Sequence, residues 1–280
     1  MSQDGSGISS LKTVGTFLNG RACSETLFHV LGEAFDDPMI PEERASMPLA
    51  GGIMQHGYQC GMLWGSTLAA GARAYRLLGA GPRAEARAIV AAGRLVETFR
   101  ARHDEINCLE ITGMDASSTP LQLTTHFFLK GGAIGCFRMA ASYAPVAYGE
   151  IDAALSEDGA EAPPAPVSCA AMVARRMGAS DLHAVMAAGL AGGIGLCGGA
   201  CGALGAAIWI TGLATLREGA RKLEPKSGRG REVIDRFLKR TDYEFECSGI
   251  VGRKFESVAD HASHLAGGGC SEIIEALAAR

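Results

Sequence analysis

The sequence predicts an all-α protein built from two tandem helical modules, related by internal duplication and packed as a pseudo-symmetric pair. Three observations predict it: helix-forming segments recur along the chain, alternating strand patterns are nearly absent, and motifs of the first half return in the second. The stretch SEDGAEAPPAPVS between the halves is acidic and rich in proline, as is typical of a solvated linker. We therefore predict modules at 1–155 and 169–280, joined by a linker at 156–168.

Helical segments are expected in both modules, about five or six in each. In the first, residues 83–102 combine helix-forming residues with apolar positions three and four apart. A Thr-Pro pair at 119–120 predicts the start of a further helix that a glycine pair at 131–132 would end. In the second, Ser180 and Asp181 predict the cap of a helix over 182–190, and residues 231–240 are amphipathic. The segment YEFEC is too short to count as a strand.

Composition narrows the class of protein. Apolar residues make up 48% and charged residues 20% of the 280 positions, a globular balance, and the net charge of −4 gives no basic surface for nucleic acid. The polar N-terminus lacks the pattern of a signal peptide, so we expect a cytoplasmic protein. Residues 184–216 carry no charge and are long enough to span a bilayer, but their glycine and alanine content favours a buried helix over membrane insertion.

Two glycine-rich stretches repeat without a gap. When AGGI at 50–53 is aligned with AGGI at 191–194, Gly57 falls on Gly198 and Cys60 falls on Cys201. Glycines four apart at 57, 61 and 65, and at 198 and 202, would form a flat stripe on a helix, where another helix or a bulky inorganic group could approach closely. If each helix begins near its cysteine, free backbone N–H groups favour the thiolate there.

Cysteine is the second repeated feature, with nine residues in the chain. Eight of them fall into two matching quartets, with steps of 37, 48 and 28 residues in the first and 32, 46 and 23 in the second. Random filling of a core would not place them so. The quartets are Cys23, Cys60, Cys108 and Cys136, and Cys169, Cys201, Cys247 and Cys270.

Four thiolates per module match the usual ligand count of an iron–sulfur cluster or a structural zinc ion. The close CxxC pairs that mark most zinc sites and catalytic dithiols are absent, and there is no CxxCH for covalent haem. Any bound group must therefore be held by residues that tertiary packing gathers.

This pattern resembles the C-GCAxxG-C-C family of redox-active proteins, whose module is about half this length and carries four cysteines, the second within a CGAxxG motif. The chain reads CGMLWG at Cys60 and CGALGA at Cys201, so each copy departs from the motif once. INCLEITGMD around Cys108 and GCSEIIEALA around Cys270 match as well. The resemblance implies a redox role and iron–sulfur binding through both quartets, but no substrate. The duplication itself suggests a pseudo-symmetric pair of modules in place of a dimer of a single-module relative.

Two further residues are candidate cofactor ligands. The ninth cysteine, Cys197, aligns with His56, and on one helix with Cys201 their sulfur atoms would share a face. Cys197 could be a fifth ligand, a resolving thiol or a packing residue. His56 could ligate iron, move protons or serve as a hydrogen-bonded structural residue. His261 and His264 have a spacing that can bind metal, but we expect them on a solvated helix face.

Three functions remain open. The first is an iron–sulfur protein, with one [2Fe–2S] or [4Fe–4S] cluster per module, that transfers electrons or reduces a small molecule as an oxidoreductase. The second is a thiol–disulfide redox protein without a cluster. The third is a zinc-binding structural protein. The redox partner, whether protein or small molecule, and the oligomeric state, including a homodimer, are left open by the sequence.

Overall fold

The computed structural model describes residues 7–115, 117–118, 121, 125, 132–157, 162–225 and 228–279. Over these ranges it contains fourteen α-helices and one 3-10 helix, and β-pairing is limited to two isolated bridges. The predicted all-α class is therefore confirmed. Seven α-helices fall in each half, more than the five or six expected, because three of them have only five or six residues. Most of the helix predicted after Thr119 lies outside the described residues, as does part of the predicted linker.

Helices of the first half carry three of its cysteines at or next to a helix start. Helix α5 confirms the prediction for 83–102 and begins at a proline, whose missing N–H costs nothing in the first turn. The first-half elements are α1 (Ser10–Leu18), α2 (Cys23–Ala34), α3 (Ile40–Ala45), the 3-10 helix η1 (Met47–Leu49), α4 (Gly61–Leu78), α5 (Pro82–His103), α6 (Cys108–Thr112) and α8 (Gly132–Ser156).

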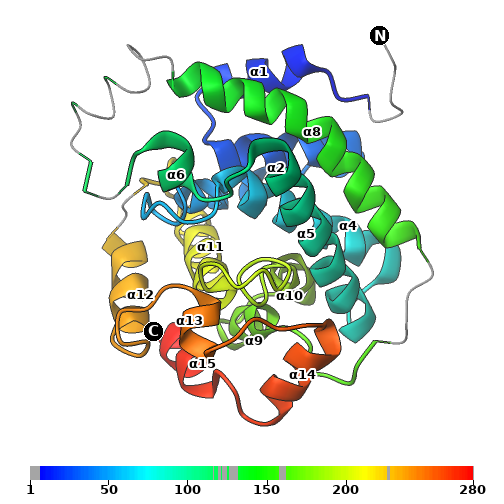
Figure 1. Cartoon of the computed structure of the whole chain (residues 1–280), viewed down its shortest axis with the longest axis vertical. Helices are drawn as coiled ribbons and strands as arrows, with labels where there is room; N and C mark the ends of the chain where they lie inside the picture. The colour runs from blue at the N-terminus through cyan, green and yellow to red at the C-terminus, as the bar shows by residue number, and fades with distance from the viewer. Residues whose placement is uncertain are drawn as a thin grey trace.

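Four helices of the second half begin at or directly after a cysteine of the second quartet. Serine side chains cap three of them, among them the predicted Ser180, whose hydroxyl accepts a hydrogen bond from the backbone N–H of His183. The elements are α9 (Cys169–Arg176), α10 (Asp181–Ala188), α11 (Gly202–Arg217), α12 (Gly228–Leu238), α13 (Cys247–Val251), α14 (Val258–Ala266) and α15 (Ser271–Ala278). In Figure 1 the first-half helices fill the upper part of the molecule and α9 to α15 the lower part.

Each repeated glycine-rich stretch begins with a left-handed turn, and its helix starts only after that turn. Residues 51–55 and 192–196 all have φ between +50° and +78°, a conformation that costs each non-glycine residue about 1–2 kcal/mol. Glycine therefore occupies two of the five positions in the first turn and three in the second. Gly57 and Gly198 lie beyond these turns and before the helices, so the predicted stripe is wrong in its first member.

Gly61 and Gly65 do allow close approach on α4, as the stripe predicted. A Cβ atom at Gly61 would lie 2.4 Å from the sulfur of Cys23, and one at Gly65 would lie 2.1 Å from the carbonyl oxygen of Ser24. Both glycines therefore admit the start of α2, which carries Cys23, against the start of α4.

The two modules share one backbone arrangement around their cysteines. An isolated antiparallel bridge joins Gln59 to Asn107 in the first module and Ala200 to Glu246 in the second. The flanking hydrogen bonds are equivalent: Cys60 N–H to Ile106 O (2.7 Å) and Cys108 N–H to Tyr58 O (2.7 Å), Cys201 N–H to Phe245 O (2.8 Å) and Cys247 N–H to Gly199 O (2.7 Å). The duplication seen in the sequence is thus a duplication of structure.

The modules pack through residues that occupy the same position in each repeat. The amide side chain of Gln59 accepts a hydrogen bond from the N–H of Ala200, its own equivalent, at 2.9 Å. The ring of Trp64 fills the space beside Gly205, also its equivalent, where a Cβ atom would come within 2.2 Å. Equivalent residues meet in this way only near an axis of pseudo-twofold symmetry, so the predicted pseudo-symmetric pair is confirmed.

The uncharged stretch 184–216 is not one helix. Its residues are divided between α10, the left-handed turn and α11, and α10 packs on α4 and α5 of the other module. Among the described residues, no helix combines the length and apolar character needed to cross a membrane.

The close contact at Gly205 predicts a destabilising substitution. Gly205→Ala places a methyl group against the buried Trp64 ring, so the free energy of unfolding should fall by about 1–3 kcal/mol. Gly149→Ala is the matched control, because Gly149 lies inside α8 where a Cβ atom would have open space for 4 Å around it, and alanine should raise stability there by up to about 1 kcal/mol. Urea denaturation of both variants measures the difference. If Gly205→Ala proves as stable as the unaltered chain, the modules are not tightly packed at this point.

Candidate functional site

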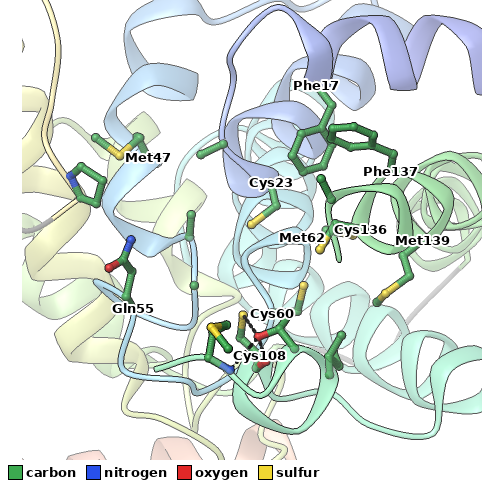
Figure 2. A pocket seen from close by; sticks show the side chains of 18 of the residues that line it. Phe17, Cys23, Met47, Gln55, Cys60, Met62, Cys108, Cys136, Phe137 and Met139 are labelled. Atoms are coloured by element: carbon green, nitrogen blue, oxygen red, sulfur yellow. Dashed lines mark hydrogen bonds between the residues drawn. The ribbon is translucent and has the colours of Figure 1, made fainter. Parts of the chain in front are cut away.

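All four cysteines of the first quartet line one cavity of about 260 Å³. Cys23 is the first residue of α2, Cys60 caps the N-terminus of α4, Cys108 is the first residue of α6, and Cys136 lies near the start of α8. Figure 2 shows these side chains entering the cavity from separate elements. The tertiary fold therefore gathers residues that are 28 to 48 positions apart in the sequence.

The rest of this cavity is mostly apolar. Phe17 of α1 and Phe137 of α8 pack together over it, with ring centroids 4.8 Å apart, and four methionines contribute thioethers to its wall. The methionines are Met47, Met62, Met114 and Met139. Such a lining keeps water away from the sulfur atoms and strengthens electrostatic interactions among them.

Cys23 is the most acidic thiol of the first quartet. A hydrogen bond from the thiol of Cys60 lowers its pKa below the usual value of 9.0, and backbone N–H groups of Gly51 and Ser24 lower it further, against the effect of burial. The shared proton raises the pKa of Cys60 well above that value, and burial raises it again. Cys23 therefore ionises before Cys60 as the pH rises, and Cys60 keeps its proton.

The other two thiols are neutral in this arrangement. Burial, with a smaller contribution from the charge of Cys23, raises the pKa of Cys108 to about 11. Burial followed by the charges of Cys23 and Cys108 raises the pKa of Cys136 to about 12. A positively charged ligand would have to displace these protons.

The second quartet also lines one cavity, but that cavity is nearly closed. Cys169, Cys201, Cys247 and Cys270 surround a volume of about 10 Å³, room for one water molecule at most. Burial raises the pKa of all four thiols, that of Cys270 to about 12. The two quartets thus share their backbone arrangement but differ in the space between their thiols.

His261 and His264 lie at the second quartet, so the predicted solvated face is wrong. His261 is only 1% exposed, lines the small cavity and donates a hydrogen bond from Nδ1 to the carbonyl of Val167 at 2.9 Å. His264 places Nε2 3.6 Å from the sulfur of Cys270. No carboxylate at motif spacing marks these histidines in the sequence, and only the fold brings α14 against Cys270.

His56 and Cys197 lie at the contact between the modules rather than in the lining of either cavity. The His56 ring packs on Phe245 of the second module at 5.0 Å. Cys197 lies in the loop before α11, not on one helix with Cys201 as the shared-face argument assumed, and its thiol donates to the carbonyl of Gly193. The amide of Gln59, which is fully buried, donates to the carbonyl of Gly193 at 2.9 Å. Sequence reasoning missed Gln59, which no motif marks.

The nine cysteines form no disulfide bond in the structure. Within the described residues, no three histidine, cysteine or acidic side chains are grouped as ligands of a single metal ion.

Comparison with known proteins agrees with this arrangement. The model of the family described as "Putative redox-active protein (C_GCAxxG_C_C)" matches the chain twice, over residues 21–147 and 167–280. The chain therefore belongs to this family, as a tandem duplication of its module. No curated protein and no solved structure matches the chain.

The raised thiol pKa values predict that the reduced, metal-free protein loses stability in alkali. A buried thiol that stays protonated when the unfolded chain ionises stabilises the fold below pH 9, and this contribution is lost as the pH rises toward the folded pKa, about 11 for Cys108. The free energy of unfolding should fall between pH 9 and pH 10, by at most about 1.4 kcal/mol for each such thiol.

Cys108→Ser removes one of these groups, so the fall in stability over the same interval should be smaller. Denaturant titrations of the two proteins at pH 8, 9 and 10 measure it. An unchanged pH dependence in the serine variant would contradict the assignment of a raised pKa to Cys108.

Proposed function

We propose that the chain is a redox protein whose first cysteine quartet holds an iron–sulfur cluster. The observation that carries this proposal is the convergence of four thiols on a single apolar cavity of about 260 Å³. Thiolates are the ligands of such clusters, and four is the usual number. The first quartet therefore suits an iron–sulfur cluster in the type of its ligand atoms, in their number and in the volume of the cavity between them.

Three helix starts support the same assignment. Cys23, Cys60 and Cys108 each lie at the N-terminal end of a helix, where free N–H groups carry partial positive charge. Donation from Gly51 and Ser24 stabilises the thiolate of Cys23, and donation from Met62 does so at Cys60. Amide donors to sulfur favour the charged form and tune reduction potential. A bound cluster supplies one-electron transfer.

The second quartet fits a cluster less well in this conformation. Its thiols enclose about 10 Å³, so they would have to separate to hold one. The sequence predicts one cluster per module, whereas the cavity volumes favour the first module. Iron analysis of cysteine variants distinguishes the two versions.

Removal of one first-quartet thiol should deplete iron. In protein purified or reconstituted without oxygen, Cys60→Ala should lose brown colour, iron and sulfide in proportion: all of each if one cluster is present and about half of each if there are two. Loss occurs because a cavity with three thiols leaves one iron without its cysteine ligand.

Cys197→Ala is the matched control, because Cys197 lies outside the lining of both cavities and should retain full iron and sulfide content. Cys201→Ala should leave the first cluster intact. Electron paramagnetic resonance of the reduced protein identifies the cluster type. Unaltered iron content in Cys60→Ala would refute the proposal.

A second candidate function rests on Cys23 and Cys60, which line the same cavity and influence each other's pKa in opposite directions. Once Cys23 has ionised, its thiolate and the neutral thiol of Cys60 can form a disulfide, with two electrons passing to an oxidant and the single proton of Cys60 passing to solvent. In this version the quartet cycles between dithiol and disulfide without metal.

Iron-free protein oxidised with diamide should then form the Cys23–Cys60 disulfide first, as peptide mapping by mass spectrometry would detect. Cys23→Ser should abolish this bond, and Cys169→Ser, the equivalent change in the second module, should not. Absence of a Cys23–Cys60 bond in the oxidised protein would exclude this candidate.

A further inference from the structure

A second cavity adjoins the first quartet. It has a volume of about 520 Å³, and Ala22, Met47 and Pro225 line both it and the thiol cavity. Ala22 directly precedes Cys23, so the shared wall lies one residue from the most acidic thiol. A molecule in the second cavity would therefore lie next to the proposed redox centre.

This adjoining cavity is lined by four cationic side chains, those of Arg21, Arg44, Arg221 and Lys222. Two carboxylates face them: Glu25, which caps the start of α2 by accepting from the Ala22 N–H at 2.7 Å, and Glu43, which pairs with Arg21 at 2.9 Å. Since the whole chain carries a net charge of −4, this concentration of positive charge runs against the overall balance.

Three of the four cations keep their charge uncompensated by direct ion pairs. Among the described residues, no carboxylate lies within ion-pair distance of Arg44, Arg221 or Lys222. The guanidinium of Arg44 instead donates to the backbone carbonyl of Arg221, which joins α3 to the segment after α11. The cavity therefore offers positive charge that an anion could neutralise.

The cationic wall distinguishes the first quartet from the second. Residues 221–225 come from the second module, follow α11 and reach the cavity of the first module. The equivalent connection in the first module, after α4, is the turn Gly79, Ala80, Gly81 and Pro82, which has no charged side chain. Among the described residues, no arginine or lysine lines the small cavity of the second quartet. Charge and open volume thus occur together, at one quartet only.

We propose that this cationic cavity binds a small organic anion, with a carboxylate or phosphate group, and holds it beside the first quartet. Its volume falls in the range of small-molecule sites. Arg21, in the segment before α2, and Arg44, in α3, are half-buried. Arg221 and Lys222 approach from the opposite module, so the anion is held between the two repeats. Only the redox character of the neighbouring quartet rests on the proposed function; the binding of the anion does not.

Alkylation of Cys23 by two reagents that differ in charge tests this site. The full chain is reduced, treated with a chelator to remove any iron, and exposed to iodoacetate or to iodoacetamide, with modification followed by mass spectrometry. Thiol reactivity and access affect both reactions alike, so they cancel in the ratio of the iodoacetate rate to the iodoacetamide rate. This ratio therefore reports the attraction of the site for the carboxylate of iodoacetate. Relative to the unaltered chain, Arg221→Gln with Lys222→Gln should lower this ratio about three- to tenfold.

The matched control is Arg83→Gln with Lys239→Gln, which removes the same total charge from exposed residues that line neither cavity. Its ratio should equal that of the unaltered chain, and 1 M NaCl, which shortens the screening length to about 3 Å, should abolish the difference between the two variants. An equal ratio in both variants, whether high or low, would overturn the proposal.

Inorganic pyrophosphate provides a second measurement that needs no variant. It should slow the reaction of Cys23 with iodoacetate in the unaltered chain and leave the reaction with iodoacetamide unchanged, and equal slowing or none would overturn the proposal. Because these reactions use the iron-free protein, their outcome is independent of the iron analysis that tests the cluster.

Discussion

The left-handed turn that precedes α4 in the first module and α11 in the second is the constraint on which both cysteine quartets depend. Five consecutive residues with positive φ reverse the chain after η1, and in the first module the N–H of Gly51 then points to the sulfur of Cys23. The chain leaves the turn into the bridge that holds Cys60 and Cys108 side by side. Since each non-glycine residue is unfavourable in this conformation, the turn persists only because the surrounding packing is formed.

Pseudo-twofold packing then brings Gln59, which follows the first turn, against the second turn. Gln59 spans the contact, accepting from the N–H of Ala200 and donating to Gly193, a member of the second turn. Burial of this amide leaves its donor and acceptor satisfied, which a buried polar group requires. The loop that supports one quartet is thereby tied to the loop that supports the other, and the duplicated chain acts as one folded unit.

Duplication has also allowed the two quartets to diverge. Cys136 is carried by the 25-residue α8, which together with Phe17 of α1 walls an open cavity, whereas Cys270 caps the eight-residue α15 and faces His264. A segment of the second module completes the wall of the first site, so one repeat contributes to the environment of the other. The first quartet is open and adjoins the cationic cavity, whereas the second is closed and lined by His261. This difference fits a division of tasks between the modules.

The all-α class, the duplication and the two quartets could be predicted from sequence, because helix formers and caps act locally and because the glycine and cysteine motifs recur in the same order in both halves. The same reasoning extended the helical stripe of Gly61, Gly65 and Gly202 to Gly57 and Gly198, which precede the helices and have positive φ. It also missed the positive φ of Ile53 and Met54, a conformation that only surrounding packing can impose. It placed His261 in solvent because a three-residue spacing does not reveal what covers a helix. Cavity volume and the cationic wall depend entirely on tertiary packing, because both arise where elements from distant parts of the chain meet.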